Sequence, residues 1–395
     1  MIDLSHAPVV DAHCHPWRNE ELVAQDPAGF EDRITMTGMC LISSGLADEQ
    51  SRAHLGLLTE STPLALTMRR RLAEHLGCEA TREEVAKARH DSLGADPVAH
   101  NRRLWATGGV AGLVYDEGYP QPTIPLEAFA ADSGATVHRV GRIEPWIAAL
   151  REQAKSYQEL EEAFEAELEQ AAADPALVAF KSVIAYRTGL DVEDPPADYC
   201  ERAFQLWRAD GFRETRLHAK PVRDRLLRRT LAAAKRHDRP LHVHCGGGDP
   251  AIVLAHARPQ DLFPLLAEHA DQPVVLIHSG WPWLEEGAFV ASVLPQVYLE
   301  VSITMPWLSL AIDQKLEVLL GAAPPAKILY GSDEASEPEV IWLSAQLGRE
   351  ALGRVLGTAV ECAWLTDREA QAIGEGVLAG NARRLHGIAG PSVGR

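Results

Sequence analysis

The stretch VVDAHCHPW, residues 9–17, places two histidines one residue apart directly after a run of apolar, β-forming residues. Side chains alternate across a strand, so Asp11, His13 and His15 are expected on one face and Cys14 on the other. Two imidazoles held side by side suit a metal ion better than a hydrophobic core. A surface or hydrogen-bonded pair of histidines is the alternative. Candidate ligands at the ends of later strands decide between the two.

Seven further apolar, β-rich runs follow, and most are separated by segments with helical periodicity. The expected strands are 8–14, 110–115, 136–143, 177–186, 240–245, 273–278, 297–303 and 326–331. Eight strands that alternate with helices predict an α/β protein with a (β/α)8 TIM barrel. An open doubly wound sheet usually has fewer strands and a glycine-rich phosphate loop after the first strand. No GxGxxG follows the first strand here, and GxxxxGK[ST] occurs nowhere.

One connection is far longer than an ordinary loop between a strand and a helix. Residues 18–109 contain no convincing strand but include the helical stretches 67–77 and 81–93. We expect a helical insertion that caps the pocket, with residues 1–17 and 110–395 forming the barrel. An oligomerisation element is the alternative, and a homodimer is compatible with it.

Composition excludes several classes of partner. With 38 basic and 56 acidic residues the formal net charge is -18, which disfavours nucleic acid and anionic membranes but not a small-molecule substrate. The sequence shows no signal peptide and no apolar run long enough to span a membrane. Its six cysteines are scattered without a CxxC pair, which is typical of a reduced, cytoplasmic protein.

Further candidate ligands follow the carboxyl ends of three later strands. His242 and His244 end the fifth strand, His278 ends the sixth, and Asp333 follows the eighth. In a (β/α)8 barrel these ends meet at one mouth and carry the chemistry, so the side chains would converge on the His-x-His pair. Imidazoles and a carboxylate together predict a divalent-metal site of zinc-like ligand type.

The sequence resembles the amidohydrolase superfamily, most of all an amidohydrolase-related branch with members fused to glutamine-synthetase-like domains. The resemblance covers nearly the whole chain, least clearly residues 18–109. It is carried by DAHCHP (11–16), FKSVIAYRTGLD (180–191), PLHVHCGGGD (240–249), VVLIHSGWPW (274–283), VYLEVS (297–302), YGSDEAS (330–336) and NARRLHG (381–387).

This resemblance implies a role for each strand-end residue. His13, His15, His244 and Asp333 would bind the metal, and His278 would lie on the metal side or the transition-state side of the site. His242 fills a position one layer deeper than the ligand of the fifth strand, so it is expected to support the site from behind. Asp11 is expected to do the same beneath the first strand.

Lys181 bears on whether the site holds one ion or two. In many superfamily members a lysine on the fourth strand is carboxylated and bridges two metals. Lys181 precedes Arg187 by six residues, which is a reason to place it too deep for bridging. Three interpretations remain open: a carboxylated bridge, a cation for a substrate carboxylate and a structural ion pair. Zinc is the first expectation for the metal, with manganese or iron as alternatives.

Other side chains near strand ends are candidates for substrate contacts. Tyr186 and Arg187 are expected to hold a substrate anion, because a guanidinium pairs with a carboxylate through two parallel hydrogen bonds. The alternative is that Arg187 ties loops together through Glu144 or Glu300. Glu144 and Trp281 are also candidate substrate contacts, with structural roles as the alternative.

The ligand set predicts the chemistry. A metal-bound hydroxide would attack an amide or related C–N bond of a small, anionic substrate, with Asp333 carrying the proton and His278 facing the developing oxyanion. Related branches of the superfamily leave a metal-dependent non-oxidative decarboxylase or a lactonase as the alternative. A second alternative is a non-catalytic, metal-bound scaffold that partners a ligase.

Overall fold

Eight parallel strands form one sheet in the order of the chain. They are β1 (Val9–Cys14), β2 (Val110–Asp116), β3 (Val137–Arg142), β4 (Leu177–Ser182), β5 (Leu241–His244), β6 (Val274–Ile277), β7 (Val297–Glu300) and β8 (Ile328–Leu329). The structure is a computed structural model that describes residues 1–43 and 49–389. Each strand overlaps one expected run, so the predicted (β/α)8 barrel is confirmed.

The sheet curves into a nearly closed barrel because the chain after β8 returns to β1. The backbone N–H of Ala12 donates to the carbonyl of Tyr330 at 2.9 Å. One step further along, the N–H of Asp333 donates to the carbonyl of His13 at 2.8 Å. These two bonds join the first strand to the segment that carries Asp333, and we refer to them as the β1–β8 seam.

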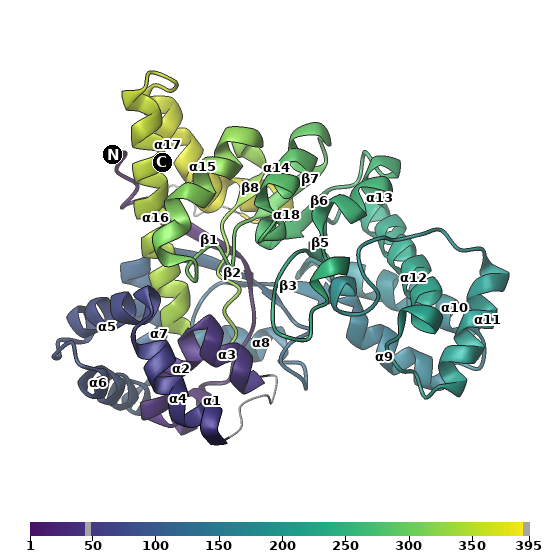
Figure 1. Ribbon diagram of the computed structural model, residues 1–395, viewed down its shortest axis with the longest axis horizontal. Coiled ribbons are helices and arrows are strands. Elements are labelled where there is room, and N and C mark those ends of the chain that lie inside the picture. The colour runs from purple at the N-terminus through teal and green to yellow at the C-terminus, as the bar shows by residue number, and fades with distance from the viewer. Residues whose placement is uncertain (44–48, 390–395) are drawn as a thin grey trace.

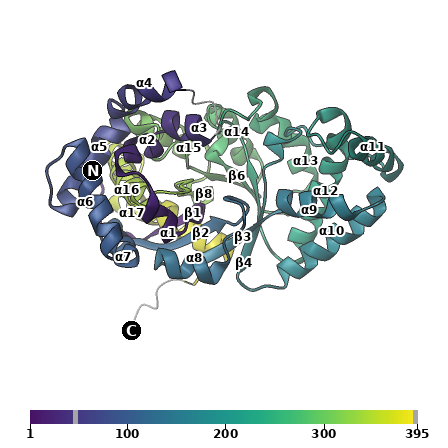
Figure 2. The same ribbon diagram turned by 90° about the horizontal axis from the view of Figure 1, so that it is seen from below.

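Helices surround the barrel. Between β1 and β2 lie α1 (Asn19–Ala24), α2 (Phe30–Ile34), α3 (Met36–Ser43), α4 (Glu49–Glu60), α5 (Pro63–Leu76), α6 (Arg82–Ala95) and α7 (Pro97–Gly108). The others are α8 (Leu126–Ser133), α9 (Ile143–Gln153), α10 (Tyr157–Ala172), α11 (Ala197–Ala209), α12 (Arg216–Arg236), α13 (Phe263–Glu268), α14 (Leu284–Val293), α15 (Ile312–Ala322), α16 (Pro338–Glu361), α17 (Asp367–Glu375) and α18 (Asn381–His386). Figures 1 and 2 show α1–α7 gathered at one side of the molecule and α9–α12 at the opposite side.

Local sequence explains where the helices between β1 and β2 begin and end. The side chains of Thr62, Thr81 and Asp96 each accept a hydrogen bond from a backbone N–H of the following first turn, which caps α5, α6 and α7. At the other end, α5 and α7 stop at Gly77 and Gly109, whose φ values of 72° and 63° favour glycine.

The hydrophobic core of this helical segment is continuous with that of the barrel. Leu104 of α7 and Met68 of α5 belong to the same cluster of buried side chains as Tyr115 of β2 and Trp342 of α16. The helices expected across residues 18–109 are therefore present, and they share a core with their neighbours. The proposed division of the chain into a barrel and a cap stays a prediction.

Apolar side chains fill the end of the barrel at which the strands begin. Val10, Val114 and Val275 pack there against Ala379 and Ala382, from the helical segment that precedes and opens α18. The C-terminal helices thus close the floor of the barrel. The opposite end, where the strands finish, is left for polar side chains, as is typical of this fold.

Among the described residues, no helix is both long and apolar enough to cross a membrane. None of the six cysteines, all of which lie within the described residues, forms a disulfide.

Candidate metal centre

Strand β1 delivers His13 and His15 through a β-bulge. Asp11 pairs with Leu113 and Cys14 with Tyr115, so three residues of β1 advance against two of β2. The strict alternation expected from the sequence is therefore wrong between Asp11 and Cys14. The carboxylate of Asp11 does not lie under the histidines as a simple strand would place it. It accepts hydrogen bonds from the backbone N–H groups of His13 at 3.1 Å and Ser332 at 3.0 Å, and so braces the β1–β8 seam.

Asp333 reaches the histidines across this seam. Its carboxylate Oδ1 lies 3.0 Å from His13 Nε2 and 3.4 Å from His15 Nε2, and its Oδ2 lies 3.8 Å from His278 Nε2. Asp333 adopts a φ of 58°, and His278 a φ of 65°. Left-handed backbone at residues other than glycine is strained and gathers at functional sites, so the fold places these two side chains at some energetic cost.

A chain of hydrogen bonds orients His278 and His244. Ser302 Oγ lies 2.6 Å from Glu300 Oε2 and 2.8 Å from His278 Nδ1. On the other side of the ring, His278 Nε2 lies 3.2 Å from His244 Nδ1. The remaining ring nitrogen of His244 is Nε2. It is buried and has no hydrogen-bond partner among the described residues.

Burial and neighbouring charges set the protonation of the cluster. Burial, together with Lys181, lowers the pKa of His13 to about 3. Burial lowers the pKa of His278 to about 4 and that of His244 well below its usual value. Burial also raises the pKa of Asp333, but the adjacent histidines overcome this and hold it well below the usual range. The imidazoles of His13, His244 and His278 are thus neutral, and the carboxylate of Asp333 is ionised.

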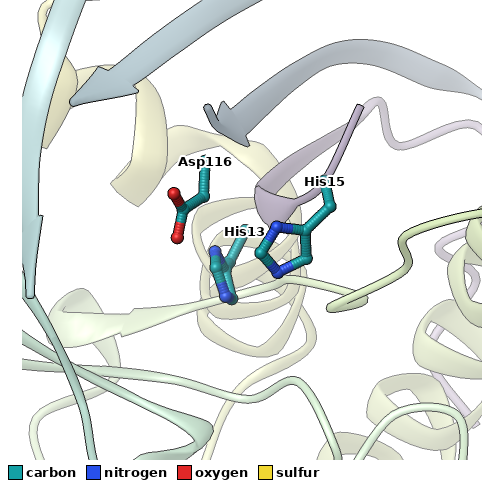
Figure 3. Close-up of side chains that lie close together, drawn as sticks. All are labelled: His13, His15 and Asp116. Atoms are coloured by element: carbon teal, nitrogen blue, oxygen red, sulfur yellow. The ribbon is translucent and has the colours of Figure 1, made fainter. Parts of the chain in front are cut away.

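Neutral imidazoles and an ionised carboxylate are the forms in which these side chains bind metal ions. The ligand atoms of His13, His278 and Asp333 all lie within 4.8 Å of one another, and so do those of His13, His15 and Asp116. Figure 3 shows Asp116 beside the His13 and His15 rings. His244 Nε2, which is buried and has no hydrogen-bond partner among the described residues, is a further atom that could bind the ion. The residues present therefore fit a divalent cation.

Lys181 and His242 occupy neighbouring strands, opposite one another in the register of β4 and β5. Lys181 Nζ lies 3.2 Å from His13 Nε2 and 3.8 Å from Asp116 Oδ2, so it is not too deep to reach the cluster. Burial lowers its pKa to about 8. His242 contacts His386 on the floor of the barrel, with 2.9 Å between the two Nε2 atoms. His242 thus lies deeper than His244, and its contact is with α18.

A cavity of about 530 Å³ opens over the cluster, a size suited to a small molecule. His13, His15, Lys181, His244, His278 and Asp333 line its polar part. Leu22, Met36 and Met39 of α1 and α3 and Trp307 of the loop after β7 form apolar parts of its wall. The segment between β1 and β2 therefore contributes directly to the cavity.

The expected substrate contacts divide into two groups. Tyr186 and Arg187 line the cavity, and Arg187 is exposed with no ion pair among the described residues, so it ties neither Glu144 nor Glu300. Glu144 is not at the cavity. It is buried, and its Oε1 accepts from Ser182 Oγ at 2.7 Å. Trp281 is not in the lining either, because it packs on the loop after β5, where its carbonyl accepts from Gly247 N. The expectation that Glu144 and Trp281 touch a substrate is thus corrected.

Sequence reasoning missed Arg142 and Tyr119. Both line the cavity, and the Tyr119 ring lies 5.5 Å from the His15 ring. Arg142 ends β3, and the sequence does contain a signal for it. A charged residue at the carboxyl end of a barrel strand is a candidate site residue. Tyr119 follows β2 in a loop, where no pattern marks it.

The amidohydrolase family model matches residues 10–388, and this chain belongs to that family. Protein fluG of Emericella nidulans is 34% identical over 233 residues, which are 56% of this chain and 27% of fluG. The match thus spans about a quarter of that relative. The resemblance inferred from the motifs is confirmed at the level of the family.

Solved structures show the same fold over nearly the full length. A protein of Lactobacillus casei described as a candidate metal-dependent hydrolase has a TM-score of 0.82 at 22% identity, covering 98% of each chain. A uronate isomerase of Bacillus halodurans has a TM-score of 0.67 at 14% identity, covering 98% of this chain and 94% of its own. A glucuronate isomerase of Caulobacter crescentus also scores 0.67, at 16% identity, covering 99% and 94%. At these identities the likeness concerns the fold alone.

Proposed function

We propose that this protein is a metal-dependent hydrolase that cleaves an amide or related C–N bond of a small, anionic substrate. One observation carries the proposal: the ionised carboxylate of Asp333 lies 3.0 Å from His13 Nε2 and 3.4 Å from His15 Nε2, at the base of a cavity that cations also line. Membership of the amidohydrolase family supports the same reaction class.

His13, His15, His244 and Asp333 are the proposed ligands of a divalent ion, with zinc as the first expectation. When bound, such an ion would lower the pKa of a coordinated water towards ~7 and polarise a carbonyl group. Whether Lys181 stays an amine or is carboxylated decides between one ion and two. Its Nζ, 3.2 Å from His13 Nε2, is within reach in either case.

The proton-carrying role falls to Asp333. Its carboxylate is ionised and in contact with the cluster, so it can accept a proton from the attacking water and pass it to the leaving amine. The expected role of His278 towards the developing oxyanion stays a prediction. Its Nδ1 contacts Ser302 Oγ at 2.8 Å, and its Nε2 lies 3.2 Å from His244 Nδ1. We propose that His278 orients His244.

The test is a panel of small N-acyl compounds, lactones and aromatic acids, assayed with metal-loaded protein. We expect the wild-type protein to release an amine from at least one N-acyl compound, and the Asp333→Asn variant to do so at least ~100-fold more slowly. Asp313→Asn, at a part-exposed ion pair with Arg354, is the matched control and should keep full activity. Release of carbon dioxide from the aromatic acids, with every N-acyl compound intact, would replace the hydrolase by a decarboxylase.

A further inference from the structure

Arg142 is a cation that the fold builds into the wall of the cavity. It ends β3, and its Nε lies 3.0 Å from both carboxylate oxygens of Asp116, while its Nη2 lies 2.5 Å from Oδ2. Asp116 is fully buried. Burial raises the pKa of Asp116, but Arg142 and Lys181 overcome this and hold it well below the usual range. One edge of the guanidinium is therefore fixed by a charged, two-point contact.

Gly118 holds the same side chain from another side. A Cβ atom at position 118 would lie 2.2 Å from Arg142 Cδ, 2.4 Å from its Cβ and 2.5 Å from its Nε. The N–H of Gly118 also donates to Asp116 Oδ1 at 2.9 Å. Only a residue without a side chain lets Arg142 lie here, so the guanidinium is held in one plane before any ligand arrives.

The opposite edge of the guanidinium is free. Among the described residues, no hydrogen bond engages Arg142 Nη1, and this atom is not one of the buried polar atoms without a partner. Arg142 lines the cavity although its side chain is only 14% exposed. Nη1 thus faces the cavity as an unused donor in a poorly solvated place, where a charged hydrogen bond is strongest.

The other cations of the cavity are less suited to this task. Lys181 is engaged by His13 and Asp116. Arg18 pairs with Asp132 at 3.6 Å. Arg187 has no such partner but is exposed, so water competes for its guanidinium.

We propose that Arg142 Nη1 binds a carboxylate of the substrate, and that the substrate joins this carboxylate to an apolar group that packs on Met36, Met39 and Trp307. The reaction of this substrate rests on the proposed function, whereas the binding of its carboxylate to Arg142 does not. The apolar lining and the unpaired edge of the part-buried Arg142 guanidinium lie in one cavity. The substrate class is thus an N-acyl or related C–N compound with a carboxylate and a hydrocarbon body.

The experiment measures equilibrium binding of two probes without a hydrolysable bond, 3-phenylpropanoate and 3-phenylpropan-1-ol, to the metal-loaded protein by titration calorimetry. Since neither probe can turn over, the result is independent of the reaction. We expect the carboxylate to bind the wild-type protein about tenfold more tightly than the alcohol. In Arg142→Lys the single ammonium is taken by Asp116, so the preference should fall below about threefold.

Two further variants keep the test decisive. Asp116→Asn/Arg142→Gln removes both charges of the pair, and with them the 3.8 Å ion pair of Lys181 with Asp116, and it should lose the preference as Arg142→Lys does. Arg139→Gln, three residues earlier on β3 and bonded to Glu117 and Asp174, should keep it. The metal content of each variant is measured in parallel.

Three results would overturn the proposal: no preference in the wild-type protein, an unchanged preference in both Arg142 variants, or a preference lost only in Arg187→Gln. An unchanged preference in the Arg142 variants would place the carboxylate on the metal. Loss of the preference only in Arg187→Gln would place the carboxylate at the exposed Arg187 instead. Amine release in the hydrolase assay, with either of these outcomes, would leave the reaction standing and remove only the role of Arg142.

Discussion

Single side chains show both what the sequence can predict and where it stops. The His-x-His pair, His278 and Asp333 converge as their positions at strand ends suggest, because parallel strands bring their carboxyl ends to one mouth. The bulge in β1 was not predictable, because it inserts one residue without a proline or glycine to mark it. Arg142 escaped notice because its partner Asp116 lies on another strand, and only the fold makes them neighbours.

The first prediction concerns metal content. Purified protein should contain about one divalent ion per chain, and His13→Ala and Asp333→Asn should each reduce it by at least ~10-fold, as loss of a ligand does. His244→Ala should also lower it, because the bare His244 Nε2 is a proposed ligand atom. Mass spectrometry of the metal in protein dialysed against a weak chelator measures this.

The variant His278→Ala distinguishes the role of His278 from that of His244. Because His278 acts through His244, this variant should keep more metal than His244→Ala under the same dialysis. The reverse order would make His278 the ligand and His244 its support. Arg139→Gln serves as the folded control with unchanged metal content.

Whole strands were the most predictable elements, and their ends the least. Buried parallel strands are mostly apolar, so runs such as β6 (VVLI) stand out, whereas β3 (VHRVGR) is polar at half of its positions and only partly buried. The expected strand 177–186 extends too far at its carboxyl end. Strand β4 ends at Ser182, and Ile184–Tyr186 forms a 3-10 turn that is equally apolar. Burial decides the composition of both, so the sequence cannot mark the boundary.

Helices α6, α7 and α16 are joined by a buried ion cluster. Arg89 Nε of α6 donates to Glu339 Oε1 of α16 at 2.7 Å, and His100 Nε2 of α7 lies 2.8 Å from the same oxygen. The side chains of Glu339 and His100 are fully buried. Burial raises the pKa of Glu339, but Arg89 and His100 overcome this and lower it to about 2.

This cluster predicts a loss of stability in acid. Because the pKa of Glu339 is lower in the folded state than in the unfolded state, its contribution is complete above pH ~4.5 and is lost as the pH falls towards about 2. Through Glu339 the free energy of unfolding should fall over this window, while the neighbouring Glu337, whose pKa burial raises, acts in the opposite direction. Urea titrations at several pH values measure it.

Glu339→Gln should be less stable than wild type at pH 7 and should flatten the acid dependence. Glu361→Gln, at an exposed end of α16, is the control and should follow the wild-type curve. A Glu339→Gln curve parallel to the wild-type curve would contradict the assignment of this window to Glu339.

The molecule as a whole carries a net charge of -18, yet its candidate site is lined by Arg142, Lys181 and Arg187. The expectation that polyanionic partners are absent stays a prediction, and the overall charge could not show where cations gather. A cytoplasmic location and a homodimer stay predictions. The cavity wall was also beyond the sequence, because Met36 and Met39 reach it only through the path of α1–α3 around the barrel mouth.

Deleting the helical segment tests whether it is a separate unit. Replacing residues 18–109 by a short glycine linker would expose Tyr115 and Trp342, which now share a cluster with Leu104 and Met68. We expect the shortened chain to lose its cooperative thermal transition and to bind a hydrophobic dye, because large apolar patches would face water. A sharp transition near that of the full chain, measured by circular dichroism, would instead support an independent cap.

The β1–β8 seam has a consequence for how the protein matures. His13 is made well before Asp333, and the backbone bond between them forms only when the barrel closes. A growing chain on the ribosome therefore exposes two histidines long before their carboxylate partner exists. Capture of an ion by all of these groups together can follow only after Asp333 has been made and has reached β1.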